Sequence, residues 1–419
     1  MLLWSGQSIS EIGSSVTQLA LPLLAVITLQ ATTFEVGALE ACTTLAFLLV
    51  ALPAGAWVDR WRRQPVLVWG DAGRVVLLAS IPVAKALGHL TLAQLYVVAL
   101  ATGVLTVFFD VAYQAYLPAL VDADQLVDGN GKLGTTQSFA QVAGPSFGGA
   151  LVGAIGAAYA IVVDAVSFGV STAMTTLIRK REPDPTPKHD RQRLRDDIRQ
   201  GLRFVLDHPI LRKIVACTGS GNFFNAMQAA VIAVFLVRVL HARPAVIGLV
   251  FSLGSIGGLL GGLTAGRLAR RFGSARIMWL SQLWAAPLAM LAPLAFRGWG
   301  VSLVAVSMFA FSMMAVVYNV AQVSYRQAIC PPELQGRMNA SVRFIVWGTQ
   351  PVGAIVGGVL GTSIGVRPTL SVAVVGSALA VLWLLASPLR TLRDVPAAPP
   401  GPEPQELLPP GQEPLVPAG

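Results

Sequence analysis

The sequence contains little charge. Only 12% of its 419 residues are Asp, Glu, Lys or Arg, and 54% are hydrophobic, whereas soluble domains carry roughly 25% charged residues. A chain of this length with so few charges cannot cover a water-exposed surface. The shortage of charge therefore excludes a soluble globular protein and indicates an outer surface that faces lipid.

Histidine and cysteine are scarce as well. The chain has four histidines and three cysteines, and the histidines fall in predicted loops or at the ends of predicted helices. An odd number of cysteines, two of them inside apolar segments, provides no disulfide framework. We therefore expect no metal centre, no metalloenzyme and no cofactor.

The charge that is present is mostly basic, with a formal net charge of +9 and a pI near 9.9. A nucleic-acid partner fits this pattern poorly, because the basic residues lie between long apolar segments rather than on one exposed face. We expect a lipid bilayer and a small-molecule substrate as partners, and no nucleic acid.

Twelve continuous apolar segments are long enough to cross a bilayer, which takes about 20 residues. Continuous runs favour helices over the alternating strands of a barrel. The sequence therefore predicts an all-α membrane protein with transmembrane helices at 3–29, 34–57, 66–88, 92–116, 130–153, 157–178, 211–237, 244–266, 276–296, 299–325, 338–361 and 366–387.

The basic residues also predict orientation. If both chain ends lie on one side, that side holds most of the 30 basic residues. The other side keeps only Lys85, Arg238, Arg243, Arg297 and Arg367. Since Lys and Arg are retained on the cytoplasmic side, and the Arg-, Ala- and Gly-rich composition is typical of a GC-rich bacterium, we predict a multi-pass protein of the bacterial cytoplasmic (plasma) membrane with both termini in the cytoplasm.

The predicted helices divide into two groups of six. Residues 1–178 form an N-terminal bundle, 179–210 a cytoplasmic linker, 211–387 a C-terminal bundle and 388–419 a Pro-rich, disordered cytoplasmic tail. The charged part of the linker, 191–203, is interpreted as a solvated connection, with a short amphipathic surface helix as the alternative.

The two groups resemble each other. Gly55-Ala-Trp-Val-Asp59-Arg60 follows the second predicted helix, and a similar stretch that begins at Gly262 and includes Arg267 follows the eighth, 207 residues later. Phe109-Asp110-Val-Ala and Tyr318-Asn319-Val-Ala recur 209 residues apart. Near-equal offsets indicate internal duplication. Two facing six-helix bundles are a transporter architecture, with the binding site between them near the midplane.

The stretch Gly55-x3-Asp59-Arg60-x-Arg62-Arg63 resembles motif A of the major facilitator superfamily. Within it, the chain is most similar to the branch of enterobactin exporters and macrolide-efflux-like carriers. The stretches that carry this likeness are Ala20-Leu21-Pro22, Gln114-Ala-Tyr-Leu-Pro118, Gly144-Pro145-x-x-Gly148-Gly149, Asp164-Ala-Val-Ser-Phe168 and Gly336-Arg337. The resemblance implies the major facilitator fold with two pseudo-symmetric bundles, and we expect a monomer.

By this resemblance, motif A forms a cytoplasmic gate. The residues involved are Gly55, Asp59, Arg60 and Arg63 in the first copy and Arg267 and Arg270 in the second. The superfamily pattern places Asp59 against the N-terminus of the eleventh helix, where a carboxylate is stabilised and Arg337 and Arg343 are candidate partners. Arg62 replaces the usual Gly. The alternative is that these arginines only enforce topology.

Small residues recur every four positions in two predicted helices. The fifth contains Gly144, Gly148 and Gly149 with Pro145, and the eighth contains Gly254, Gly258 and Gly262. Such spacing lets helix backbones approach closely, and Pro145 favours a kink. Static packing and a sliding interface between the halves both fit. The resemblance associates the Gly-Pro pair with exporters.

Ionisable residues inside apolar segments are costly and usually functional. Asp71 and Arg74, three residues apart, are expected to form a buried structural pair, and Asp164 is interpreted as a structural hydrogen-bonding site. Asp110 has no basic residue near it in its own helix, so it is the first candidate for proton coupling, with Glu11 the second.

The second half offers amides and a phenol instead, since no acidic residue occurs from 210 through 332. Candidate substrate-cavity residues are Gln18 in the first half and Asn222, Asn225, Gln228, Tyr318, Asn319 and Gln322 in the second. We hypothesise that the first half titrates while the second binds neutral polar groups of the substrate.

The predicted function is transmembrane transport by a secondary active transporter rather than an enzyme. The favoured form is a proton-coupled exporter, an antiporter for efflux of an amphipathic drug, antibiotic or siderophore. An importer of a small metabolite is the alternative, and a membrane enzyme is a third, which lacks a cluster of His, Asp or Ser at one depth. Gly131-Lys132 is followed by Leu133 and forms no phosphate loop, so we expect the energy to come from an ion gradient, that of protons.

Overall fold

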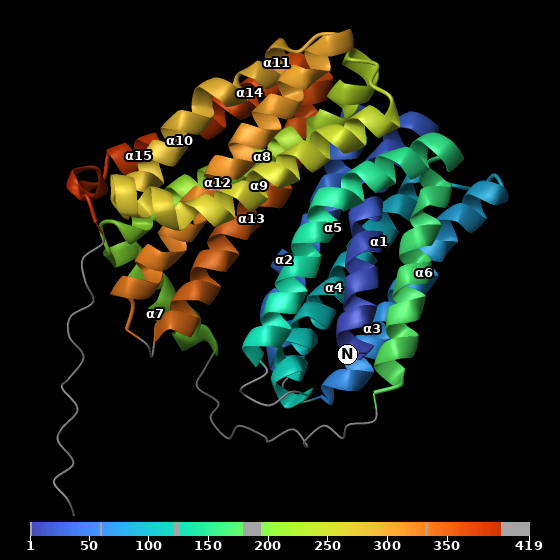
Figure 1. Ribbon diagram of the computed structural model, residues 1–419, viewed down its shortest axis with the longest axis horizontal. Coiled ribbons are helices and arrows are strands. Elements are labelled where there is room, and N and C mark those ends of the chain that lie inside the picture. The colour runs from blue at the N-terminus through green and yellow to red at the C-terminus, as the bar shows by residue number, and fades with distance from the viewer. Residues whose placement is uncertain (1, 59–60, 121–125, 179–193, 332–333, 395–419) are drawn as a thin grey trace, which may run out of the picture.

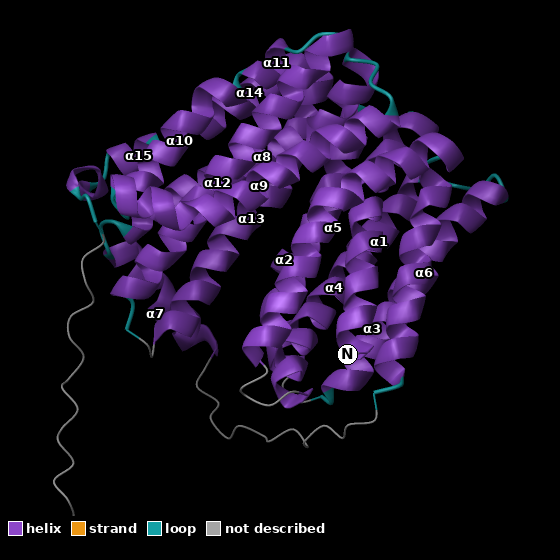
Figure 2. Cartoon of the chain, in the orientation of Figure 1, coloured by secondary structure: helices purple, strands orange, loops and turns teal. Residues whose placement is uncertain are grey.

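The computed structural model describes residues 2–58, 61–120, 126–178, 194–331 and 334–394, and all the regular structure within these ranges is helical (Figures 1 and 2). The predicted all-α fold is confirmed. Eleven of the described helices are long and apolar enough to cross a membrane. A twelfth, α5 (Leu126–Ile155), packs against three of them, α1, α6 and α9.

The first half comprises α1 (Leu2–Leu23) continued by the π-helical turn η1 (Leu24–Thr28), then α2 (Thr33–Val58), α3 (Arg63–Ala86), α4 (Leu92–Leu120), α5 and α6 (Ala157–Thr176). The second comprises α8 (Leu211–Val234) continued by η2 (Phe235–Val239), α9 (Pro244–Phe272), α10 (Arg276–Ala289) with α11 (Leu291–Leu294), η3 (Gly298–Gly300), α12 (Val301–Ile329), α13 (Gln335–Ser363), and α14 (Val366–Leu379) with α15 (Leu382–Leu385).

The predicted spans coincide with these helices. Their ends differ by at most six residues, and the largest difference is at α9, which runs to Phe272 rather than to 266. Helices continue past the hydrocarbon region because long basic side chains such as Arg270 and Arg271 can reach the polar interface. Hydropathy therefore underestimates the length of this helix.

The backbone repeats between the halves where it turns. Residues with positive φ occur at Gln30 and His241, at Gly88 and Gly298, and at Gly156 and Gly365, in each case 209 to 211 positions apart. The π-helical turns that end the first helix of each half, η1 and η2, recur at the same distance. Left-handed turns are sparsely populated by most residues. Their recurrence at one offset therefore supports the internal duplication inferred from sequence.

Part of the linker is helical. The favoured interpretation of the charged stretch was a solvated connection, but α7 (Leu194–Asp207) forms a helix that packs against α13. At their crossing, a Cβ on Gly201 would lie 2.7 Å from the carbonyl carbon of Arg337. Arg337 also donates a hydrogen bond from Nη1 to Gln200 Oε1. The rest of the linker, 179–193, lies outside the described residues.

The turn between α7 and α8 depends on a neutral histidine. His208 Nδ1 accepts hydrogen bonds from the backbone N–H groups of Ile210, at 3.3 Å, and Leu211, at 3.2 Å. Partial burial lowers the pKa of His208. The unprotonated ring nitrogen thereby satisfies N–H groups that a helix start leaves without internal partners.

The first residues of the predicted disordered tail, 388–394, are ordered. Pro388–Thr391 form the 3-10 turn η5, and Leu389 is buried. Arg393 O accepts from the backbone N–H groups of Ala275 and Arg276, and Asp394 Oδ1 accepts from that of Ser274. These bonds attach residues 388–394 to the connection between α9 and α10. The remainder of the predicted tail, 395–419, lies outside the described residues.

The two bundles share one apolar core at one end and have separate cores at the other. We call the end that carries the N-terminus and α7 the linker end and its opposite the far end (Figure 1). At the far end, one buried cluster includes Leu23 and Leu24 from the first half with Phe235 and Ile247 from the second. Toward the linker end each half has its own cluster.

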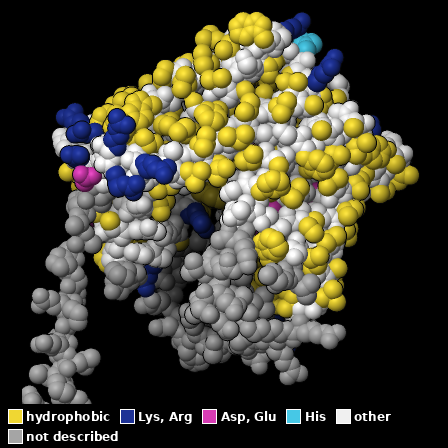
Figure 3. Space-filling model, viewed as in Figure 1, with side chains coloured by type: hydrophobic (Ala, Val, Ile, Leu, Met, Phe, Trp, Pro, Cys, Tyr) yellow, Lys and Arg dark blue, Asp and Glu magenta, His cyan; other side chains and the backbone are white. Residues whose placement is uncertain are grey.

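The halves meet along two helix pairs, α2 with α13 and α5 with α9. Near the far end, a Cβ on Gly37 would lie 2.8 Å from Gly358 Cα, and one on Gly149 would lie 2.9 Å from Gly248 Cα. The contact between α2 and α13 extends to Phe47 and Trp347, whose ring centroids are 4.8 Å apart. The space-filling view shows the molecule hollowed between the halves on the linker side of these contacts (Figure 3).

The glycines singled out in the sequence divide between two roles. Gly149 meets the other half, whereas Gly144 and Gly148 pack against α1 within their own half. Gly254, Gly258 and Gly262 face side chains of α12, also within their own half. The residue of α9 that crosses α5 is Gly248, four residues from Ser252, whose Oγ accepts from Ser146 N at 3.0 Å.

Candidate functional site

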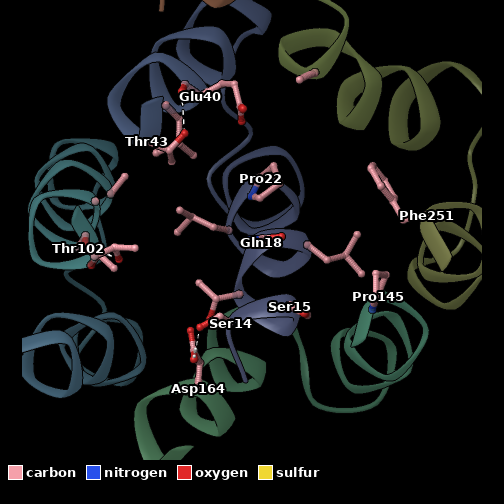
Figure 4. Close-up of a pocket in the computed structure, with 18 of the residues that line it drawn as sticks. Ser14, Ser15, Gln18, Pro22, Glu40, Thr43, Thr102, Pro145, Asp164 and Phe251 are labelled. Carbon is pink, nitrogen blue, oxygen red and sulfur yellow. Dashed lines mark hydrogen bonds between the residues drawn. The ribbon is translucent and has the colours of Figure 1, made fainter. Parts of the chain in front are cut away.

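A cavity of about 710 Å³ lies between the two halves. All six long helices of the first half contribute to it, and the second half contributes α8, α9 and Met308 of α12. Figure 4 shows α1 crossing the middle of this site, with Gln18 and Pro22 between Glu40 on one side and Asp164 on the other. The volume is sufficient for a drug-sized molecule.

The first half supplies every charged side chain of the cavity wall. Four carboxylates line it, from Glu11, Glu40, Asp110 and Asp164, together with one guanidinium, that of Arg74. Charged groups are rare at membrane depth, and those that occur usually face a cavity and serve function. This concentration of acids on one side is the main chemical feature of the site.

Arg74 is the electrostatic centre of this wall. Its Nη2 lies 2.9 Å from Asp71 Oδ1, and its guanidinium sits 4.4 Å from the ring centroid of Phe109 and 4.3 Å from that of Phe168. Asp71 and Arg74 are both buried. Arg74 also interacts electrostatically with Asp110, Asp164 and Glu11. Asp110, which has no basic neighbour in its own helix, thus has one across the fold.

Asp164 is held by hydroxyl groups. Ser14 of α1 and Ser167 of α6 each donate a hydrogen bond to Asp164 Oδ1, at 3.3 Å. Glu11, one helical turn before Ser14, accepts a hydrogen bond at 3.0 Å from Gln7 Nε2. Asp110 and Glu11 are both part-exposed to the cavity, while Asp164 is buried. The two candidates for proton coupling therefore share one water-accessible wall.

Glu40 was absent from the sequence-based candidates. It lies in α2 on a helical face formed by Val36, Leu39, Thr43 and Phe47, all of which line the cavity. The spacing of these residues follows the i, i+3, i+4, i+7 pattern of one helix face. An acid within an apolar span was the available signal, but the sequence alone does not say which face of this helix meets the cavity.

The candidate cavity residues separate into two groups. Gln18, Asn225 and Gln228 line the cavity. Asn222, Tyr318, Asn319 and Gln322 are not among the lining residues, and each takes part in a hydrogen bond elsewhere. Asn222 donates to Val346 O of α13 at 3.2 Å, Tyr318 shares a 2.7 Å hydrogen bond with Thr218, and Gln322 donates to Asn319 at 2.8 Å.

The motif A gate is only partly visible. Asp59 and Arg60 lie outside the described residues, Gly55 belongs to α2, and Arg63 is the first residue of α3. Arg267 and Arg270 are exposed in the last two turns of α9, where cations are favoured by the helix dipole. Of the two suggested partners of Asp59, Arg337 bonds Gln200 and Arg343 lies 5.8 Å from the Trp347 ring centroid.

Within the described ranges, no group of three or more His, Cys, Asp or Glu residues is arranged to hold a metal ion. The three cysteines are free thiols, and Cys217 and Cys330 are buried. The chemistry available in the cavity is therefore that of carboxylates, one guanidinium, amides and hydroxyls.

Known proteins resemble this chain over most of its length. The enterobactin exporter EntS of Citrobacter koseri is 25% identical over 381 residues, which cover 88% of this chain and 87% of the exporter. The multidrug efflux pump Tap of Mycolicibacterium fortuitum is 27% identical over 381 residues, 85% of this chain and 88% of the pump.

Solved structures share the fold. The nucleoside transporter NupG superimposes with a TM-score of 0.70 at 14% identity, covering 92% of this chain and 98% of that structure. A bacterial homologue of the iron transporter ferroportin, in an inward-facing state, gives a TM-score of 0.70 at 17% identity, covering 92% of this chain and 97% of that structure. The major facilitator fold implied by motif A is confirmed.

The family described as transmembrane secretion effector, one of the major facilitator families, matches residues 1–409. This range contains both bundles, the cavity between them and the linker. The chain belongs to this family of multi-pass membrane transporters.

Proposed function

We propose that this protein is a proton-coupled exporter that moves an amphipathic small molecule by alternating access. The observation that carries the proposal is the composition of the cavity. One wall, from the first half, carries all its carboxylates, while the other offers amides and apolar side chains. Such a site can hold protons and an amphipathic molecule at the same depth between two bundles.

The coarser statement follows from family membership. The chain is a secondary transporter and not an enzyme. A secondary transporter draws its energy from an ion gradient, and carboxylates are the groups through which pumps and transporters relay protons. Proton coupling is therefore the form of energy coupling that the Glu11, Asp110 and Asp164 wall best supports.

The direction of transport is supported by two observations. The relatives EntS and Tap are named as an exporter and an efflux pump. The shared core closes the far end, and the molecule is hollowed between the halves on the linker side (Figure 3). With both termini in the cytoplasm of a bacterial cell, as the basic residues predict, this state would load substrate from the cytoplasm. Import of a metabolite in the same fold is the alternative.

A flux experiment tests the coupling. Purified protein is reconstituted in proteoliposomes, a pH gradient is imposed, and movement of a panel of fluorescent or radiolabelled amphipaths is followed. We expect Asp110→Asn to reduce pH-driven transport at least about tenfold and Glu11→Gln to reduce it as well, because neither amide can release a proton.

The control variant is Asp207→Asn, since Asp207 is an exposed residue of α7 whose carboxylate pairs with the exposed side chain of Arg203. It should transport like the wild type. If Asp110→Asn and Glu11→Gln both leave pH-driven transport intact, the proposed proton coupling is wrong.

A further inference from the structure

The cavity carries an excess of negative charge. Among the described residues, its wall includes four carboxylates and a single guanidinium, all from the first half. The guanidinium of Arg74 is already engaged by Asp71 at 2.9 Å and by the rings of Phe109 and Phe168. When these acids are ionised, the cavity offers a substrate more negative charge than its single guanidinium can balance.

Glu40 stands apart from the acids around Arg74. It is carried by α2, whereas Arg74 is carried by α3 and pairs with Asp71 of its own helix at 2.9 Å. Figure 4 shows Glu40 and Asp164 on opposite sides of the site, with α1 between them. The cavity therefore has two separate acidic regions, and only one of them contains a base.

The carboxylate of Glu40 has no protein partner among the described residues. The hydrogen bonds recorded for Glu40 reach its backbone carbonyl, which accepts from Thr43 at 2.7 Å and Thr44 at 3.1 Å. Its side chain lies in the protein interior, and its partial exposure is to the cavity. A buried acid without a partner is costly unless a ligand supplies one.

The rest of the cavity suits the remainder of an amphipathic cation. The wall that the second half contributes combines the amides of Asn225 and Gln228 with apolar side chains. The apolar members include Leu39, Phe47, Ile232, Phe251 and Met308. Aromatic faces attract cations as well as apolar groups, so the positive group and the hydrophobic body of one molecule both find matching surfaces here.

We infer that Glu40 recognises a positive charge on the transported molecule, so that the substrate class is a cationic amphipath. This inference rests on the proposed function, since it names the substrate of the same cavity. It selects among the candidate cargoes: a lipophilic ammonium or phosphonium compound fits the site, whereas an anionic molecule, such as a siderophore with acidic iron-binding groups, would meet unpaired carboxylates.

A pair of matched ions tests the inference directly. Tetraphenylphosphonium and tetraphenylborate have nearly the same size and apolar surface but opposite charge. Displaceable binding of each is measured on the purified full-length protein in neutral detergent, with protein-free micelles subtracted. We expect the wild type to bind the phosphonium at least about tenfold more tightly than the borate, and Glu40→Gln to remove most of that preference.

Two further variants serve as controls. Glu40→Asp retains the charge and should retain a preference for the cation, which separates a loss of charge from a loss of shape. Glu35→Gln changes another acid of α2, one that does not line the cavity. The Glu35 carboxylate instead accepts hydrogen bonds from Thr32 beside the start of α2. This variant should bind the two ions like the wild type.

The inference is wrong if the wild type binds the two ions equally or binds neither. It is also wrong if Glu40→Gln, shown by size-exclusion chromatography to be folded, prefers the phosphonium as strongly as the wild type does. The proposed function fails separately. Phosphonium binding without pH-driven flux would contradict the coupling alone, while pH-driven transport of only neutral or anionic compounds would contradict the assignment of substrate class alone.

Discussion

Asp164 approaches α1 at a point where α1 has no side chain. A Cβ added to Gly13 would overlap Ser167 Oγ and lie 2.9 Å from Asp164 Cα. At the next residue of the helix, Ser14 supplies a hydroxyl group to the carboxylate. Glycine at this position therefore allows a buried acid and its hydrogen-bond donors to be assembled between two helices.

Gly13→Ala should destabilise the protein because the added methyl must displace Asp164 or Ser167. Overpacking of this kind costs about 1–3 kcal/mol, so we expect the midpoint of thermal unfolding in detergent to fall by several degrees, as followed by tryptophan fluorescence.

Gly153→Ala is the matched control, since nothing lies within 4 Å of a Cβ at this helical position. It should leave the midpoint unchanged or raise it slightly, because alanine is the better helix former. Equal effects of the two substitutions would contradict the packing role of Gly13.

Individual residues were predictable where one local rule decides their position. An Asp and an Arg three residues apart on one helix, such as Asp71 and Arg74, can be paired from spacing alone. Which face of a helix meets the cavity depends on neighbours that are distant in sequence. Asn225 and Asn222 lie on the same helix, but one lines the cavity and the other bonds Val346. Glu40 could not be distinguished from a lipid-facing position without that information.

At the scale of elements, the far end is closed by two close helix crossings. Gly149 and Gly248 let α5 and α9 touch, and Gly37 and Gly358 do the same for α2 and α13. Hydrogen bonds between the halves accompany both contacts. Ser146 Oγ donates to Ser252 Oγ at 2.7 Å, Phe34 N donates to Thr362 Oγ1 at 3.1 Å, and Arg238 Nη2 donates to Ala31 O at 2.7 Å.

Gly149→Leu should therefore force the far end apart, since its side chain would collide with Pro244 O and Gly248 Cα. Gly153→Leu, one turn further along the same helix, has free space and serves as the control. Spin labels at the exposed loop residues His89 and Ile364, on a background without cysteine, report the separation of the halves.

We expect the distance distribution between these labels to shift to longer values in Gly149→Leu and to match the parent protein in Gly153→Leu. A parent-like distribution in Gly149→Leu would show that this crossing does not hold the far end closed.

Helices that cross the membrane were predictable as elements because hydropathy alone positions them. The elements outside the membrane were not predictable in this way. The charges of α7 pointed to a solvated linker, whereas the helix forms because its apolar face packs on α13, with Val205 fully buried. Residues 388–394 are ordered by backbone hydrogen bonds to the connection between α9 and α10, which no local sequence pattern indicates.

At the scale of the whole molecule, the two halves share a fold and differ in chemistry. The repeat offset predicted two bundles, and paired positive-φ residues such as Gly156 and Gly365 recur at the same interval. The absence of acids from 210 through 332 predicted that the second half contributes amides rather than carboxylates to the cavity. Which end of the cavity is closed was not predictable, because one sequence must support both states of an alternating-access cycle.

The central claim of this account is that protons and substrate occupy one cavity and affect each other. The carboxylates of Glu11, Asp110 and Asp164 line the same space as the amides of Asn225 and Gln228. By thermodynamic linkage, a substrate that favours ionised carboxylates must lower the protein's affinity for protons, and protons must weaken its binding in return.

Proton release on substrate binding is the most direct measurement of this claim. A transported compound, identified by the flux experiment, is added to the purified protein in weakly buffered detergent solution containing a pH-sensitive dye. We predict the release of protons in proportion to bound substrate, and a clearly smaller release from Asp110→Asn that still binds. Saturating binding without any change in pH would contradict the coupling of protons and substrate in this cavity.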